Sequence, residues 1–111
     1  MKDTVKFEFN SLDENMIVDS LCKMRNDLLS QDRDVNAIDD ILLKLNDSYK
    51  VEFDKYEIGI VINALNQVRT EMKQNNESTI NINELILKII DETNSKKKIL
   101  LRILRKDDVR K

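Results

Sequence analysis

The sequence predicts an all-α protein made of two tandem αα-hairpins, which form a four-helix core with approximate two-fold symmetry, and a basic C-terminal helix. Three observations support this prediction. The chain matches itself at a shift of 44 residues without a gap, and 8 of the 42 aligned pairs between residues 7–48 and 51–92 are identical. Apolar residues recur with a helical period. The composition, with no proline and one glycine in 111 residues, is typical of helical proteins.

The internal repeat indicates a duplicated structural unit, because its apolar positions are retained even where the residues differ. In one set, Leu12, Met16, Ile17, Leu21, Met24 and Leu28 align with Tyr56, Ile60, Val61, Leu65, Val68 and Met72. In the other set, Ile38, Ile41, Leu42 and Leu45 align with Ile82, Leu85, Ile86 and Ile89. A lone amphipathic hairpin leaves its apolar face in water, so two copies should pack face to face and bury all these positions.

A short segment with alternating apolar and charged residues precedes each long helix, at residues 5–9 and 49–53. This alternation is typical of half-buried strands, and two-fold-related neighbours run antiparallel, which predicts a small ribbon that bridges the repeats. The alternative is that Phe9 and Phe53 are hydrophobic staples before the helices. Phe53 has Ile58 to pack against in that case.

Long amphipathic helices are predicted at about 11–30 and 55–74 from the spacing of the apolar residues. Both begin with an N-cap candidate followed three residues later by an acidic residue, Asn10 with Asp13 and Asp54 with Glu57. Shorter helices should follow at about 35–47 and 79–92. Their N-cap candidates are Asp34 and Ser78.

The net charge of −2 divides unevenly along the chain. Residues 1–94 contain 11 Lys or Arg and 19 Asp or Glu, a net charge of −8, whereas residues 95–111 contain 8 and 2, a net charge of +6. We therefore expect one helical domain over residues 1–94 and a basic amphipathic helix or tail over 95–111. Four apolar residues of this tail share one helical face: Ile99, Leu100, Ile103 and Leu104.

The basic tail has two interpretations. As structure, it is a fifth helix that covers the bundle and places its cations against the acidic domain. As a functional element, it contacts nucleic-acid phosphates, a groove of a partner protein or an anionic membrane surface. The candidate contact residues are Lys96, Lys97, Lys98, Arg102, Arg105 and Lys106.

Acidic residues are dense in the first repeat and form a candidate interaction face of Asp27, Asp32, Asp34, Asp39 and Asp40. Such a face imitates a phosphate backbone or is simply a solvated surface. The ligand spacing and turn glycine of a calcium loop are missing, so no metal site is predicted. Arg25 and Arg69, like Lys44 and Lys88, are charged residues kept in both repeats, which favours a structural role within each hairpin.

Enzymatic function is not predicted. The chain contains no histidine and one cysteine, Cys22, so a nucleophile with a histidine base is excluded, and Gly59 alone does not make a phosphate-binding loop. No cofactor is implied. A single cysteine and the lack of a signal-like or membrane-spanning run favour a cytoplasmic protein.

The segments 56–69 and 37–45 resemble a helical-hairpin pattern of small uncharacterised proteins from low-GC Gram-positive bacteria, their phages and their plasmids. With both copies, the resemblance covers about 80 residues. It implies a small cytoplasmic accessory protein that acts on a larger partner, and it brings no catalytic residues. We therefore expect a non-enzymatic protein-interaction module, which occupies a partner surface. The alternatives are a small nucleic-acid-binding regulator that uses residues 95–111 and, as an assembly, a homodimer.

Overall fold

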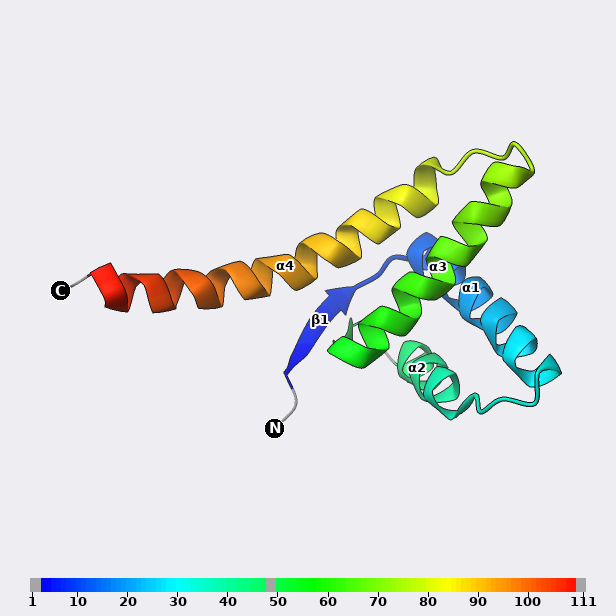
Figure 1. Cartoon of the computed structure of the whole chain (residues 1–111), viewed down its shortest axis with the longest axis horizontal. Coiled ribbons are helices and arrows are strands. Elements are labelled where there is room, and N and C mark those ends of the chain that lie inside the picture. Colours follow the sequence, from blue (N-terminus) through cyan, green and yellow to red (C-terminus); the bar gives the residue numbers. More distant parts are fainter. Residues whose placement is uncertain (1–2, 48–49, 110–111) are drawn as a thin grey trace.

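The computed structural model describes the backbone of residues 3–47 and 50–109 and the side chains of residues 3–46 and 50–95. Tyr49 of the predicted second strand and residues 110–111 of the predicted tail lie outside this description. The elements in chain order are β1 (Thr4–Glu8), α1 (Ser11–Ser30), α2 (Asn36–Asp47), β2 (Lys50–Asp54), α3 (Lys55–Gln74) and α4 (Ile80–Val109). The described chain is therefore mostly helical, with a small two-stranded antiparallel sheet (Figure 1).

The sheet is the ribbon that the alternating segments predict, shifted by one residue in each strand. Val5 lies opposite Phe53, and Phe7 lies opposite Val51. The apolar side of the ribbon is buried, whereas Lys6, Glu8 and other charged residues on the opposite side are exposed. Phe7 lies 5.8 Å from Phe53, measured between ring centroids. Phe7 and Phe53 thus belong to the strands, and Phe9, which directly follows β1, is buried in the same core. Because the ribbon is formed, the interpretation of the two segments as staples alone is wrong.

The long helices α1 and α3 begin and end where the sequence predicts. Both N-termini are closed by complete capping boxes. The backbone N–H of Asp13 donates to Asn10 Oδ1 at 2.8 Å, and that of Glu57 donates to Asp54 Oδ1 at 2.8 Å. These bonds satisfy amide groups that lack a partner inside the helix, which explains why both helices begin at these residues.

Both long helices also end in the same way. After α1, the N–H of Arg33 donates to the Leu28 carbonyl, and after α3 the N–H of Glu77 donates to the Met72 carbonyl. Between them, Asp32 and Asn76 adopt left-handed conformations with φ of 61° and 59°. This is the Schellman arrangement, and Asn and Asp tolerate it better than other residues with a side chain.

The core joins the ribbon to the faces of all four helices. Leu21, Leu65, Ile38 and Ile82 are buried in it, as the repeat predicts. The expectation that all aligned apolar positions are buried is wrong for Leu12 and Tyr56, which are 52% and 69% exposed. Four residues of the ribbon segments are buried in the core: Phe7, Phe9, Val51 and Phe53.

Helices α1 and α3 pack against each other, α2 packs against β2, and α4 packs against β1. Within each repeat, α1 also contacts α2, and α3 contacts α4. The two ribbon strands, which come from the starts of the two repeats, therefore tie the four helices together at one end of the core.

Helix α4 differs most from the prediction. It does not end near residue 92 but continues through the Asn94–Ser95 step to Val109, a total of 30 residues. Asn and Ser are weak helix formers but not breakers, and the following Lys, Leu, Arg and Ile residues favour helix. The last turns extend beyond the ribbon and away from the other helices (Figure 1). Residues 95–109 are therefore helical, as part of α4, and of the two interpretations of the basic tail, a separate fifth helix that covers the bundle is not formed.

Candidate functional site

A groove of about 600 Å³ lies between α1 and α2. Its apolar lining includes Val18 from α1 and Leu42 and Leu43 from α2. Val18 and Leu42 are half-buried, but Leu43 is 63% exposed. Leu43 therefore adds exposed apolar surface next to Val18 and Leu42 in this groove.

Charged residues border this groove. Arg25 Nε donates to Asp39 Oδ1 at 2.7 Å, which connects α1 to α2 along the groove. The hydrogen bond to Asp39 and the charge of its carboxylate raise the pKa of Arg25 above its ordinary value. Both side chains are more than one-third exposed, so this ion pair holds the rim in place without adding much stability. Glu14 adds a further carboxylate to the lining.

The surroundings of the groove form the acidic part of the molecule. Residues 11–47, which contain α1 and α2, have 4 Lys or Arg and 9 Asp or Glu, a net charge of −5. The aligned residues 55–91 have 4 and 5, a net charge of −1. The acidic character that the whole sequence suggests therefore belongs mainly to the first helix pair, and the groove lies in this pair.

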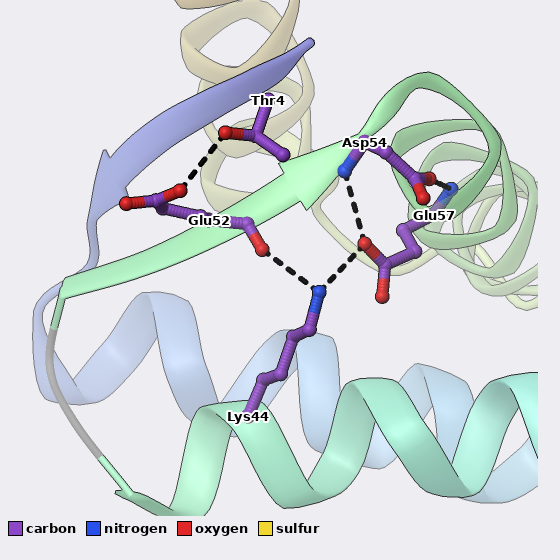
Figure 2. A network of polar contacts seen from close by, with 5 residues as sticks. All are labelled: Thr4, Lys44, Glu52, Asp54 and Glu57. Carbon is purple, nitrogen blue, oxygen red and sulfur yellow. Dashed lines mark hydrogen bonds and ion pairs between the residues drawn. The ribbon is translucent and has the colours of Figure 1, made fainter. Parts of the chain in front are cut away.

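Lys44 and Lys88 connect the two helix pairs. Lys44 Nζ on α2 donates to Glu57 Oε1 at the start of α3, at 2.8 Å, and to the Glu52 carbonyl at 3.0 Å (Figure 2). Lys88 Nζ on α4 donates to Asp13 Oδ2 at the start of α1, at 2.8 Å. The expectation of a role within each hairpin is wrong for these lysines, because helix packing places each beside the capping box of the other repeat.

The same two lysines also lie above ribbon phenylalanines. Lys44 Nζ is 5.9 Å from the Phe53 ring centroid, and Lys88 Nζ is 5.5 Å from that of Phe9. The arginines, in contrast, stay within their own helix pairs: Arg25 binds Asp39, and Arg69 Nη1 donates to Asn83 Oδ1 at 3.3 Å. The lysines therefore connect the two helix pairs, whereas each arginine makes its contact within one helix pair.

A second, more polar pocket of about 580 Å³ lies between the end of α1 and α3. Asn63, Asn66, Gln67 and Thr70 line its α3 side, and Asp27 is on its α1 side. Asn66 Oδ1 is buried and accepts no hydrogen bond from the described residues. Met24 and Leu28 of α1 add apolar side chains, but polar residues make up more of this lining than of the α1/α2 groove.

The predicted acidic face is only partly assembled. Asp39 lies on the α1/α2 groove, and Asp27 lies on the α1/α3 pocket. Asp32 and Asp34 are exposed in the turn between α1 and α2, where Asp34 Oδ1 accepts a hydrogen bond from the Asn36 N–H. Asp40 is exposed on α2. These residues lie where α1 ends and α2 begins, at one end of the first helix pair, and the acidic face stays a prediction.

The predicted basic contact residues all lie on the C-terminal half of α4, and their side chains fall outside the described residues. These basic residues are Lys96, Lys97, Lys98, Arg102, Arg105 and Lys106. Only the course of the helix is established for them. That course takes them away from the acidic body instead of onto it (Figure 1).

Sequence reasoning missed Leu43 as a surface residue, although a signal was present. Leu43 and Leu87 are identical in the aligned repeats and lie outside the apolar stripe that forms the core. Both are exposed, Leu43 at 63% and Leu87 at 58%. Because both leucines lie outside the apolar positions that form the core, the sequence alone could have indicated that they are exposed.

Among the described side chains, those of residues 3–46 and 50–95, no cluster of three or more acidic or cysteine residues is arranged to hold a metal ion. No helix of the described chain has an apolar stretch sufficient to cross a bilayer. Comparisons of the chain with protein-family models, with curated proteins and with solved structures find no match.

Proposed function

We propose that this chain is a non-enzymatic protein-interaction module that acts by occupying a surface of a partner protein. We further propose that it is an accessory or inhibitory protein of a phage or mobile element, and that it works in the cytoplasm of a bacterial host cell. The resemblance of segments 56–69 and 37–45 to small helical-hairpin proteins supports the proposed origin from a phage or mobile element. The groove between α1 and α2 supports the mode of action.

The proposal includes the architecture. We propose that residues 7–48 and 51–92 are two tandem hairpins related by an approximate two-fold axis through the ribbon. The hydrogen bonds of Lys44 with Glu57 and of Lys88 with Asp13 are equivalent at a shift of 44 residues. In the ribbon, Phe7 lies opposite Val51, its own counterpart at this shift. We propose that a two-fold axis passes between Phe7 and Val51. Such an axis exchanges these two residues and also exchanges the two lysine contacts.

The observation that carries the proposed function is the exposure of Leu43 in an apolar groove of the acidic helix pair. An amphipathic helix in an apolar groove is a common mode of protein recognition. A groove lined by Val18, Leu42 and Leu43 suits the apolar face of such a helix, and the acidic surroundings favour a basic one.

The test is affinity purification from the source cell with tagged wild-type chain, Leu43→Arg and Leu87→Arg. Leu87 is the matched control, because it is the aligned leucine of the second helix pair and is similarly exposed. We expect a partner protein that is retained by wild type and Leu87→Arg after nuclease treatment and is lost with Leu43→Arg. Equal retention by all three proteins contradicts the groove as the binding site.

The second candidate function is a nucleic-acid-binding regulator. The observation that favours it is the basic end of α4, whose backbone leaves the body and is free to approach a duplex (Figure 1). Phosphate contacts make the affinity fall steeply with salt concentration. We suggest a salt titration of duplex DNA binding with the full chain and with a variant carrying Lys98→Gln, Arg102→Gln and Arg105→Gln. A steep salt slope that this variant loses favours this function, and no binding at low salt removes it.

A further inference from the structure

We propose that the groove between α1 and α2 binds the basic segment of α4, residues 95–111, from a second copy of this chain. The inference rests on the proposed function, because it assumes that the groove is a protein-binding site. It goes further by naming the occupant.

Charge complementarity is the first argument. The helix pair that forms the groove, residues 11–47, has a net charge of −5, and the basic segment has a net charge of +6. The aligned helix pair, residues 55–91, has a net charge of only −1. The basic segment is therefore attracted most strongly to the part of a second molecule that contains the groove, and the two charges nearly cancel.

The pattern of apolar residues is the second argument. The α4 backbone is helical through the basic segment, up to Val109. At helical spacing, Ile99, Leu100, Ile103 and Leu104 share one face. This face matches the apolar lining of the groove, in which the exposed Leu43 lies. Residues 96–106 span about 17 Å as a helix, and the 12 residues of α2 span about 18 Å, so the two elements have similar lengths.

The course of α4 argues that the occupant comes from another molecule. The helix is continuous from Ile80 to Val109, and its end points away from α1 and α2 (Figure 1). The basic segment cannot reach the groove of its own chain unless α4 breaks. A second copy needs no such break, and when each copy inserts its segment into the other, the assembly closes as a dimer.

The first experiment measures self-association of the full chain by sedimentation equilibrium over a range of concentrations and salt. We expect wild type and Leu87→Arg to form a dimer that weakens as salt rises, because screening reduces the attraction between −5 and +6. Leu43→Arg should weaken the dimer by about 30-fold or more, the effect of losing one well-packed interface residue. The variant with Lys98→Gln, Arg102→Gln and Arg105→Gln should weaken it as well and reduce the salt dependence, because the charge of the segment falls from +6 to +3.

The second experiment uses Cys22, which is exposed, lies on the lining of the groove and is the single cysteine of the chain. A photoactivatable cross-linker on Cys22 of unlabelled chain is mixed with ¹⁵N-labelled chain. We expect cross-links from Cys22 to ¹⁵N-labelled peptides of residues 95–111, and fewer of them with Leu43→Arg. Cross-links to other regions overturn the proposed occupant.

A chain that stays monomeric at all concentrations, or a dimer that Leu43→Arg leaves unchanged, overturns the inference. Far-UV circular dichroism of each variant establishes that it is folded. The failure of the inference differs from the failure of the proposed function: a monomeric chain that still captures a different protein through Leu43 retains the function and loses only this occupant.

Discussion

Helices α1 and α3 pack against each other, and their buried residues agree closely. Leu21 and Leu65 are both fully buried, and beside them lie the buried small residues Ser20 and Ala64. Their exposed residues do not agree. On α1 these include Asn15, Asp19 and Lys23, whereas the aligned residues on α3 are Gly59, Asn63 and Gln67, which are all uncharged.

The same contrast holds for the complete helix pairs, with −5 in residues 11–47 and −1 in residues 55–91. Close packing restricts the size and shape of core residues, but an exposed position accepts most residues with little effect on stability. The two pairs therefore share what the core requires and differ at exposed positions, where we propose that a partner is recognised. The following predictions test whether the interiors are equivalent.

The largest effect is expected for the core. Leu21→Ala and Leu65→Ala should each lower the free energy of unfolding by about 2–5 kcal/mol, because each removes buried side-chain volume. Urea denaturation of both variants measures this. Loss of stability in only one of the two variants contradicts an equivalent interior.

The next effect concerns the lysines that connect the helix pairs. Lys88→Gln and Lys44→Gln should each cost about 1–3 kcal/mol, because each leaves a mostly buried carboxylate without its charged partner. Denaturation at neutral pH measures the cost. The Lys44 variant also loses the bond to the Glu52 carbonyl, so a clearly larger effect at Lys88 contradicts the equivalence of the two connections.

Replacing the N-caps should have a smaller effect. Asn10→Ala and Asp54→Ala should each reduce the free energy of unfolding by about 0.5–2 kcal/mol, since each exposes the amide group of Asp13 or Glu57. Thermal melts followed by circular dichroism measure both. A neutral result at one helix shows that its start is held by the ribbon and not by the cap.

The smallest effect is a gain in stability. Gly59→Ala should raise the free energy of unfolding by about 0.5–1 kcal/mol, because an added Cβ meets nothing within 4 Å and alanine favours helix. The mirrored control, Asn15→Gly, should lower it by about a few tenths of a kcal/mol. If Gly59→Ala instead lowers the free energy of unfolding, glycine is required at this position of α3 for the stability of the fold, and the difference from Asn15 on α1 has a structural cause.

The sequence was informative wherever the structure depends on neighbouring residues. The capping boxes at Asn10 and Asp54 were predicted because their hydrogen bonds span three residues. The ribbon was predicted from its alternation. The end of α4 was not predicted, because no strong helix breaker follows residue 92, and the expected end there depended on the end of the repeat and not on the helix itself.

The candidate site was less predictable. The sequence indicated the basic segment and a dense acidic region, but not that Leu43 faces solvent between Glu14 and Asp39. The exposure of Leu43 depends on where α2 lies against α1. The angle between these helices is set by the packing of the whole core and not by the residues near Leu43.

The sequence by itself determined the mostly helical class and the starts of the long helices, because backbone hydrogen bonding, helix propensity and the period of apolar residues act over short distances. It also indicated the two strands through their alternation, although their pairing joins residues far apart in the chain. Only the tertiary structure decided that Lys88 reaches Asp13, that α1 and α2 enclose an apolar groove and that α4 extends beyond the body. These features join residues far apart in the chain. Their positions follow from the way the ribbon and the helices share one core.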